Sequence, residues 1–217
     1  MVKNVILVSG KLQSGKNTFV DLMMEELKKT NLKVDFDFFA KSVKDQCKDI
    51  FKNLIEYLNN ISTEFNIPEL YTIDDNWYET KNKITRILLQ TYGTEIFRDM
   101  VDSNHWSKIL KRRIMMERNE DILFITDVRF KSEISTICDT ESIKHDHRTI
   151  SPKYKVIKIR IERDNYVRGD DPIFTHQSEI DLDDFQEWDY LVKNNGTLDD
   201  LKRNAQDIVS SILNQSS

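Results

Sequence analysis

Near the start of the chain stands the segment Asn4-Val5-Ile6-Leu7-Val8-Ser9-Gly10-Lys11-Leu12-Gln13-Ser14-Gly15-Lys16-Asn17-Thr18, on which the prediction of the fold rests. Its continuous apolar run, Val5 to Val8, is typical of a buried parallel strand. The run ends in a loop spaced Gly-x-x-x-x-Gly-Lys, and an amphipathic helix follows. Backbone N–H groups of such a loop, together with the helix N-terminus, form a concave positive site for phosphate oxygens. The sequence therefore predicts a phosphate-binding loop.

The residues of this loop have separate expected roles. Gly10 and Gly15 permit backbone angles and a close ligand approach that a Cβ would obstruct. Lys16 is expected to reach the β- and γ-phosphates of a nucleotide as a point charge. The next position normally holds the Ser or Thr whose hydroxyl binds magnesium, but here it is Asn17, followed by Thr18. The magnesium ligand therefore stays open.

Composition restricts the class of protein. The chain has 217 residues and a formal net charge of −5, which argues against a general nucleic-acid binder. Cys47 and Cys138 have neither metal-type spacing nor a disulfide framework, so a reduced, cytoplasmic location is expected. We find no signal segment and no stretch long and apolar enough to span a bilayer. The sequence does not settle the oligomeric state, and a homodimer remains open.

The order of predicted elements favours an α/β fold. Apolar runs predict strands over 5–8, 34–39, 122–126, 154–161 and 188–192. Helices are expected over 19–27 and over 84–90. A long helix is expected from an N-cap at Ser42 to Leu58. Another is expected from the break at residues 92–94 to residue 110, and a last one after a cap at Thr197. A polar irregular segment is expected over 61–80. Residues 132–151 are expected to form a short helix followed by a second irregular segment. The pattern predicts one domain, 1–217, with a mostly parallel sheet in a three-layer P-loop NTPase fold, a helical region over 41–113 and a lid over 162–184.

Two further segments carry chemistry-bearing side chains. Asp127 follows the buried run 122–126, and an acidic residue there suits a place near magnesium, through water or by orienting the phosphate donor. His145-Asp146-His147 lies in a hydrophilic stretch, where such histidines are usually solvated rather than metal ligands. Cys47 falls in an apolar helical stripe and is interpreted as a small buried hydrophobe. Arginines on a closing lid would favour group transfer to a second bound molecule.

The chain resembles the phage deoxynucleoside monophosphate kinases, in which the loop lysine is commonly followed by an acidic or amide residue and then threonine. Asn17-Thr18 agrees with that pattern. The resemblance spans nearly the whole chain and continues through Phe39-Ala40-x-x-x-Lys44, Leu89-Gln90-x-x-Gly93-Thr94-x-x-x-Arg98, Trp106, Asp127-Val128-Arg129-Phe130, His176-x-Ser178-Glu179 and Asn194-Asn195-Gly196-Thr197.

This resemblance implies transfer of a phosphoryl group from ATP, with Mg²⁺, to a deoxynucleoside monophosphate for dNTP synthesis. Catalytic roles would fall to Lys16, Asp127, Arg129, Arg163 and Arg168. ATP would contact Gly10, Lys11, Ser14, Gly15, Lys16, Asn17, Thr18, Asn195 and Gly196. The acceptor would contact Lys44, Arg86, Gln90, Thr94, Arg98, Trp106, Arg129 and Glu179, and Mg²⁺ would lie near Asn17 and Asp127.

Two alternatives remain open at this point. Animal-type phosphomevalonate kinases have a similar loop and a similar Asp-Val-Arg segment, whereas the motif from Gln90 to Thr94 favours the nucleotide branch. The chain could instead be a nucleotide-binding regulatory protein without transfer activity. The lid arginines speak against that alternative, because a pure binder has no use for them. Small-molecule nucleotides are the expected partners, and neither nucleic acid nor a membrane is expected.

Overall fold

A computed structural model describes residues 3–66, 83–145, 148–164 and 177–215. The chain forms two compact units. Unit 1 contains Met1–Phe38 and Leu110–Ser217, and unit 2 contains Phe39–Ile109. Each unit is described by its own contacts. The prediction of a helical region over 41–113 coincides largely with unit 2, whose described elements are all helical.

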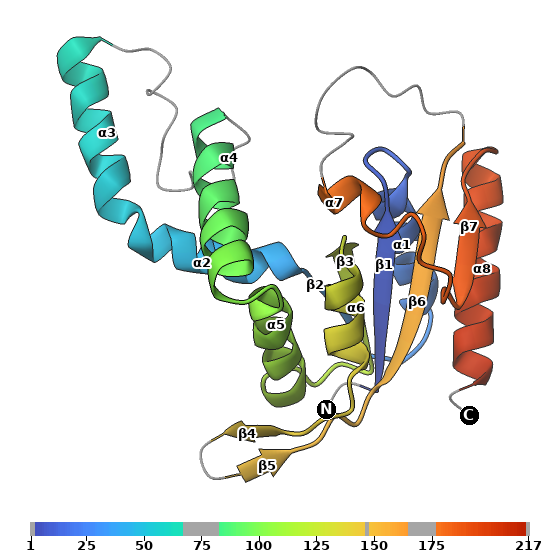
Figure 1. Cartoon of the computed structure of the whole chain (residues 1–217). Coiled ribbons are helices and arrows are strands. Elements are labelled where there is room, and N and C mark those ends of the chain that lie inside the picture. Colours follow the sequence, from blue (N-terminus) through green and yellow to red (C-terminus); the bar gives the residue numbers. More distant parts are fainter. Residues whose placement is uncertain (1–2, 67–82, 146–147, 165–176, 216–217) are drawn as a thin grey trace. The chain divides into compact units, whose positions relative to one another are not determined.

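Unit 1 is built on a five-stranded sheet with the order β2-β3-β1-β6-β7. Every neighbouring pair in it is parallel, and β1 lies at the centre (Figure 1). This confirms the predicted α/β fold with a mostly parallel sheet. The strands are β1 (Asn4–Gly10), β2 (Val34–Asp37), β3 (Ile122–Val128), β6 (Lys155–Glu162) and β7 (Tyr190–Lys193).

Helices cover both faces of this sheet. Helices α1 (Lys16–Leu27) and α8 (Leu198–Asn214) lie on one face, and α6 (Lys131–Cys138) lies on the other (Figure 1). Ile6 and Val8 pack in the core cluster that α1 and α8 share with the sheet. Successive side chains of a strand point to opposite faces, and Val5 and Leu7 are fully buried as well. The result is a three-layer sandwich.

The predicted cap of the last helix is confirmed. Thr197 Oγ1 accepts a hydrogen bond from the backbone N–H of Asp200 at 3.2 Å, and the Asp200 carboxylate accepts one from the N–H of Thr197 at 2.8 Å. This reciprocal capping box satisfies two N–H groups that a helix start would otherwise leave without partners.

The polar region before β6 contains more structure than the sequence indicates. After α6 the chain forms an antiparallel hairpin, β4 (Ile143–His145) and β5 (Arg148–Ile150). Asp146 and His147 of the histidine-containing stretch lie outside the described residues. A short helix, α7 (Gln177–Ile180), precedes β7. None of the described helices is long and apolar enough to cross a membrane.

Unit 2 packs around its own small core. Cys47, Ile55, Tyr92 and Trp106 form a buried cluster, so the interpretation of Cys47 as a buried hydrophobe is confirmed. Burial raises the pKa of its thiol to about 12. The helices are α2 (Phe39–Ile50), α3 (Lys52–Phe65), α4 (Lys83–Gln90), the wide π-helix η2 (Thr91–Val101) and the start of α5 (His105–Met116).

The single helix predicted from Ser42 to Leu58 is wrong. The strand before it stops at Asp37, whose carboxylate turns to bind Arg113 and the N–H of Phe38, and α2 already begins at Phe39. Ser42 is therefore buried inside the helix rather than capping it. At Phe51 the backbone leaves helical angles (φ −91°, ψ 2°), and α3 starts as a separate helix.

The break predicted at residues 92–94 is also wrong, because α4 continues directly into η2. Gly93 lies inside η2, where a Cβ would come within 3.0 Å of Val43 Cγ1. The glycine thus serves close helix packing rather than a turn. The real break comes at Asp102, which is extended (φ −160°, ψ 118°) and accepts a hydrogen bond from the N–H of Asn104. The helix expected to reach residue 110 is therefore two helices.

A buried ion pair offers a test of this architecture. Arg113 Nε and Nη2 donate to the two carboxylate oxygens of Asp37 at 2.8 and 2.7 Å, and Asp37 is only 1% exposed. Removing one partner of such a pair leaves an uncompensated buried charge. We expect Asp37→Asn to lower the free energy of unfolding by about 3 kcal/mol in chemical denaturation.

Asp35→Asn is the matched control. Asp35 lies on the same strand and binds Arg118 Nη2 at 2.7 Å, but its side chain is 47% exposed. Exposed pairs contribute about 1 kcal/mol or less, so this variant should stay close to the parent. Equal losses in both variants would contradict the argument from burial.

Candidate phosphate-binding site

The loop between β1 and α1 has a backbone that curls into a cradle. Gln13 and Gly15 both adopt left-handed angles, with φ of 62° and 90°. The N–H of Ser14 donates to the carbonyl oxygen of Lys11 at 3.1 Å, which closes the turn. Gln13 is one of two non-glycine residues with positive φ among the described residues. Such angles concentrate at functional sites, where the surroundings hold them in place.

Asn194 holds this cradle from the outside. Its Nδ2 donates to the carbonyl oxygen of Ser14 at 2.9 Å, and a Cβ on Gly15 would lie 2.2 Å from the same nitrogen. Gly15 is therefore required both by its φ and by the contact with Asn194. Sequence analysis did not assign Asn194 a role, because only the fold brings the end of β7 against the loop.

The cradle contains donors that suit an anion. No side chain caps the N-terminus of α1, and its first turn carries no acidic residue. The partial positive charge of a helix N-terminus therefore has no internal counter-charge there. The buried Ser14 hydroxyl has no hydrogen-bond partner among the described residues. A phosphate oxygen would satisfy both features.

The carboxyl ends of three strands meet beside the loop. Ser9 Oγ donates to the Val128 carbonyl oxygen at 3.0 Å and accepts from Arg160 Nη1 at 2.9 Å. Between Leu7 and Ser9 the β1–β3 register shifts, so that three steps along β3 match two along β1. This bulge lies at Asp127, and bulges commonly redirect a side chain next to an active site. Asp127 thus stands in the part of β3 that leaves the regular ladder.

Lys16 lies among four charged groups of unit 1. The pKa of its ammonium is lowered from 10.5 to about 8, most by burial and next by the charge of Arg129. The carboxylates of Asp127 and Glu179 oppose that shift, while Arg160 adds to it. The structure therefore brings together Lys16, Asp127, Arg129 and Glu179, as the sequence predicts, and adds Arg160. At neutral pH the lysine is still mainly charged.

Arg160 is a buried cation that sequence analysis missed. It lies on β6, only 6% of it is exposed, and its guanidinium carbon is 5.8 Å from the ring centroid of Trp188. Burial lowers its pKa, although Asp183, Glu162 and Glu179 oppose the shift. In the sequence it stands in an alternating strand pattern, where an arginine is usually interpreted as solvent-exposed. Only the sheet order shows that β6 is an inner strand beside β1.

A cavity of about 430 Å³ opens beside the loop. Arg163 lines it together with Arg160, whereas Arg168 and His176 lie outside the described residues. Its other lining residues come from the loop, from the end of β6 and the chain just after it, and from α7 and the turn that follows α7: Lys11, Leu12, Ser14, Ile161, Glu162, Asp164, Glu179 and Asp183.

The Asn195-Gly196 turn has structural contacts of its own. Asn195 exchanges two hydrogen bonds with Asp164, at 2.9 and 2.8 Å, and so holds the chain where it leaves β6. A Cβ on Gly196 would lie 2.5 Å from Asp200 Oδ2, which explains the glycine through the capping box of α8.

The other predicted acceptor residues belong to unit 2. Lys44 lies on α2, Arg86 and Gln90 lie on α4, and Thr94 and Arg98 on η2. Lys44, Thr94 and Arg98 are partly buried, and Gln90 is exposed. Trp106 packs in the core of this unit, and its Nε1 donates to the Gly93 carbonyl oxygen at 2.7 Å.

The residues present fit magnesium only as a cation shared with phosphate. The described residues contain no cluster of three His, Cys, Asp or Glu side chains that could hold a metal ion. Asn17 and Thr18 at the start of α1 are exposed, and Asp127 is near Lys16. Mg²⁺ typically takes one or two protein oxygens and completes its shell with water and phosphate.

A central parallel sheet, helices on both faces and a glycine loop entering α1 define the P-loop kinase-like class of α/β proteins. Within that class, the model of the deoxynucleotide monophosphate kinase family matches residues 35–205, and the chain belongs to this family. The matched range does not include the loop after β1, so the geometry of that loop supports phosphate binding independently of the family match.

The chain is also similar to a viral protein over most of its length. The chain is 26% identical, over 172 residues, to a protein of Acanthamoeba polyphaga mimivirus that is provisionally named a deoxynucleotide monophosphate kinase. The similar region covers 75% of this chain and 76% of the viral protein.

The electrostatics of Lys16 lead to a prediction. We expect its side-chain NMR signals, assigned with Lys16→Arg, to titrate near pH 8. Arg129→Gln should raise this pKa because it removes a repulsive charge, and Asp127→Asn should lower it because it removes an attractive one. Shifts in the same direction for both variants would contradict the described surroundings.

The same shift has a consequence for stability. Because the folded-state pKa of Lys16 lies below its ordinary value of 10.5, the unfolded chain binds more protons between about pH 8 and 10.5. The contribution of this group therefore makes stability rise with pH across that window, and below it the cost of burying the charge is fully present.

Proposed function

We propose that the chain transfers the γ-phosphoryl group of ATP to a deoxynucleoside 5′-monophosphate. The family membership supports a deoxynucleotide monophosphate kinase. The observation that carries the choice of a triphosphate donor is the cradle around the Ser14 hydroxyl, which no described residue binds. Beside it lie the partly buried ammonium of Lys16 and the start of α1, which no side chain caps. Three kinds of phosphate-binding group meet there.

The donor is assigned to this cradle. Backbone N–H groups from Gly10 to Lys16 would bind the β- and γ-phosphates, with the Lys16 ammonium as counter-charge. Lys11 and Asn17 flank the loop, and Thr18 would stand near the α-phosphate. The turn Asn195-Gly196 is proposed to line the adenine with its backbone, since the side chain of Asn195 binds Asp164.

The acceptor is assigned to unit 2 and to Arg129. Guanidinium groups match the oxygens of a phosphate in pairs, which suits Arg86, Arg98 and Arg129. Lys44, Gln90 and Thr94 would contact the phosphate, the base or the sugar of the acceptor. Trp106 would support this site from the core rather than stack on the base, because its ring is buried and its N–H is bonded.

The chemical step needs charge neutralisation more than proton transfer. An anionic oxygen of the acceptor phosphate attacks the γ-phosphorus, the bond from that phosphorus to the β–γ bridging oxygen breaks, and ADP leaves with the electron pair. No general base is required, since the attacking oxygen carries no proton at neutral pH. Lys16, Arg163 and Arg168 would neutralise charge on the transferred group.

Mg²⁺, when bound, would neutralise charge on the β- and γ-phosphate oxygens. Asn17 and Asp127 would hold it, directly or through water.

The proposed setting is the supply of dNTP precursors in the cytoplasm, which would be that of the host if the source is a phage. Small nucleotides are the proposed partners, and the net charge of −5 favours them over a polynucleotide.

A coupled ADP-release assay tests this function. With ATP and Mg²⁺, we expect turnover on one or more of the dNMPs and none on phosphomevalonate. Lys16→Ala should lower kcat/KM by about 10³-fold, because it removes a charge that stabilises the transferring group. Removal of Mg²⁺ with EDTA should abolish turnover.

The competing outcomes are distinct. Turnover on phosphomevalonate with silence on all nucleotides would reassign the acceptor. ATP binding without turnover on any acceptor would indicate a regulatory binder. Lys16→Arg is the matched control: it keeps the charge but not the shape, so activity intermediate between parent and Lys16→Ala would show that the charge matters.

A further inference from the structure

The described residues at the end of the predicted lid are acidic. They comprise α7 and the turn that follows it, residues 177–184, and we call them the acidic segment. Its carboxylates bind groups of the loop or of the strand ends. The contacts are Glu179 to Leu12 and Arg129, Asp181 to Lys131 N–H, Asp183 to Lys11 and Arg160, and Asp184 to Lys131.

Glu179 binds the loop itself. Its Oε2 accepts a hydrogen bond from the backbone N–H of Leu12 at 3.0 Å, and its Oε1 pairs with Arg129 Nη1. The side chain is 6% exposed, so both contacts are shielded from water. A backbone N–H of the loop and an arginine of β3's carboxyl end thus share one buried carboxylate.

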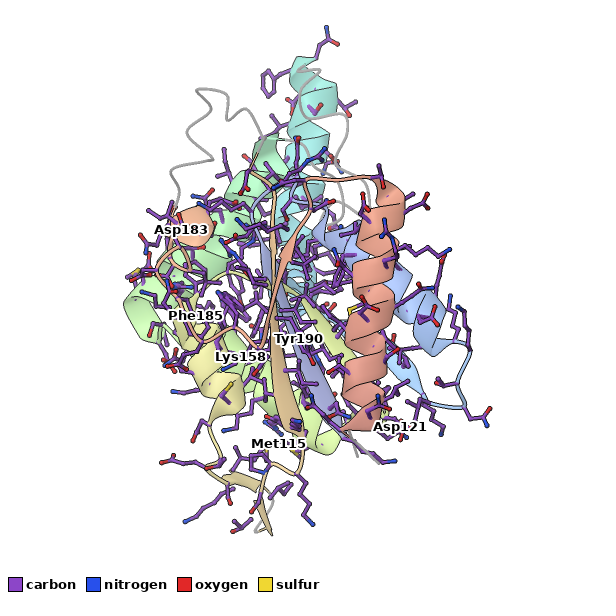
Figure 2. All side chains as sticks on the ribbon, turned by 90° about the vertical axis from the view of Figure 1, so that its right-hand side faces the viewer. Met115, Asp121, Lys158, Asp183, Phe185 and Tyr190 are labelled. Atoms are coloured by element: carbon purple, nitrogen blue, oxygen red, sulfur yellow. The ribbon has the colours of Figure 1, made fainter. Side chains whose placement is uncertain are left out.

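Asp183 binds two further cations of the site. Its Oδ2 lies 2.5 Å from Lys11 Nζ, and its Oδ1 lies 3.3 Å from Arg160 Nη2. Figure 2 shows Asp183 at the end of α7, with Phe185 and Lys158 lower in the view. The Asp183 side chain is 41% exposed, which makes it accessible to substitution without opening the core.

The groups that Glu179 and Asp183 bind, namely a loop N–H and the side chains of Lys11 and Arg160, are of the kind that a bound polyphosphate requires. Carboxylate and phosphate oxygens compete for the same N–H and cationic groups, with similar geometry. Lys11, Arg160 and Ser14 line the same cavity, and no described residue binds the Ser14 hydroxyl. In the ligand-free chain, the acidic segment therefore stands where negative charge is expected from a nucleotide.

We propose that the acidic segment is an internal anion that competes with nucleotide phosphate. Asp183 occupies Lys11 and Arg160 in the ligand-free chain and releases them when a polyphosphate binds. The segment thus lowers the affinity of the free loop for phosphate and links binding at the loop to movement of residues 181–184. This inference rests on the proposed function, because it requires a phosphate donor at the loop.

Asp183→Asn tests the competition. Titration calorimetry with inorganic tripolyphosphate, without Mg²⁺, measures the affinity of the loop for phosphate alone. We expect the variant to bind on the order of fivefold more tightly than the parent, the size expected from two partly exposed ion pairs. Circular dichroism and thermal unfolding would show that the fold is retained.

Asp184→Asn is the matched control. It removes the same charge one residue further on, but its carboxylate pairs with Lys131 and is 76% exposed. Its affinity for tripolyphosphate should equal that of the parent. A gain as large as that of Asp183→Asn would overturn the proposal, because the effect would then come from net charge.

Lys11→Gln, combined with Asp183→Asn, identifies the released group. The gain in affinity from Asp183→Asn, measured against Lys11→Gln alone, should be smaller than the gain measured against the parent, since one of the two released cations is missing. An affinity of Asp183→Asn equal to or weaker than the parent would overturn the internal-anion proposal and leave the proposed function intact. Failure of the parent to bind tripolyphosphate or ATP would overturn both.

Discussion

The Ser9 hydroxyl joins the ends of the three strands on which the site depends. It donates to Val128 on β3 and accepts from Arg160 on β6, and Ser9 itself is the residue before the last in β1. Because β1 is flanked by these strands, the loop after Ser9 begins at a fixed place relative to Asp127 and to the end of β6. Disturbing this junction would move the cradle, the bulge and the buried arginine together.

Much of the fold could be predicted from local patterns. The apolar runs of β1 and β3 are buried in a parallel sheet, and runs of that kind have few other stable arrangements. The loop from Gly10 to Lys16 could be predicted because the spacing of its glycines and lysine is a local pattern. The cap at Thr197 could be predicted because a capping box is local. These features need only a few neighbouring residues.

What could not be predicted depends on contacts between distant segments. Gly93 looks like a helix breaker until Val43 is seen against it, and Asn194 looks like a turn residue until its amide is seen under the loop. Arg160 alternates as a surface residue would, yet it is buried, and its strand β6 lies between β1 and β7. Asp37 was expected inside a strand and instead ends it, because its carboxylate binds Arg113. Local patterns could not show this pair, since Arg113 lies 76 residues away in sequence.

Unit 2 has the character of an insert with closely spaced ends. The chain leaves unit 1 after Phe38 and re-enters at Leu110, and Asp37 and Arg113, beside those two points, are in direct contact at 2.7 Å. Insertions with adjacent ends disturb the host domain little. If unit 2 binds the acceptor as proposed, exchange or remodelling of this unit would change the acceptor preference and leave the loop after β1 unchanged. One scaffold would then acquire new monophosphate specificities during evolution.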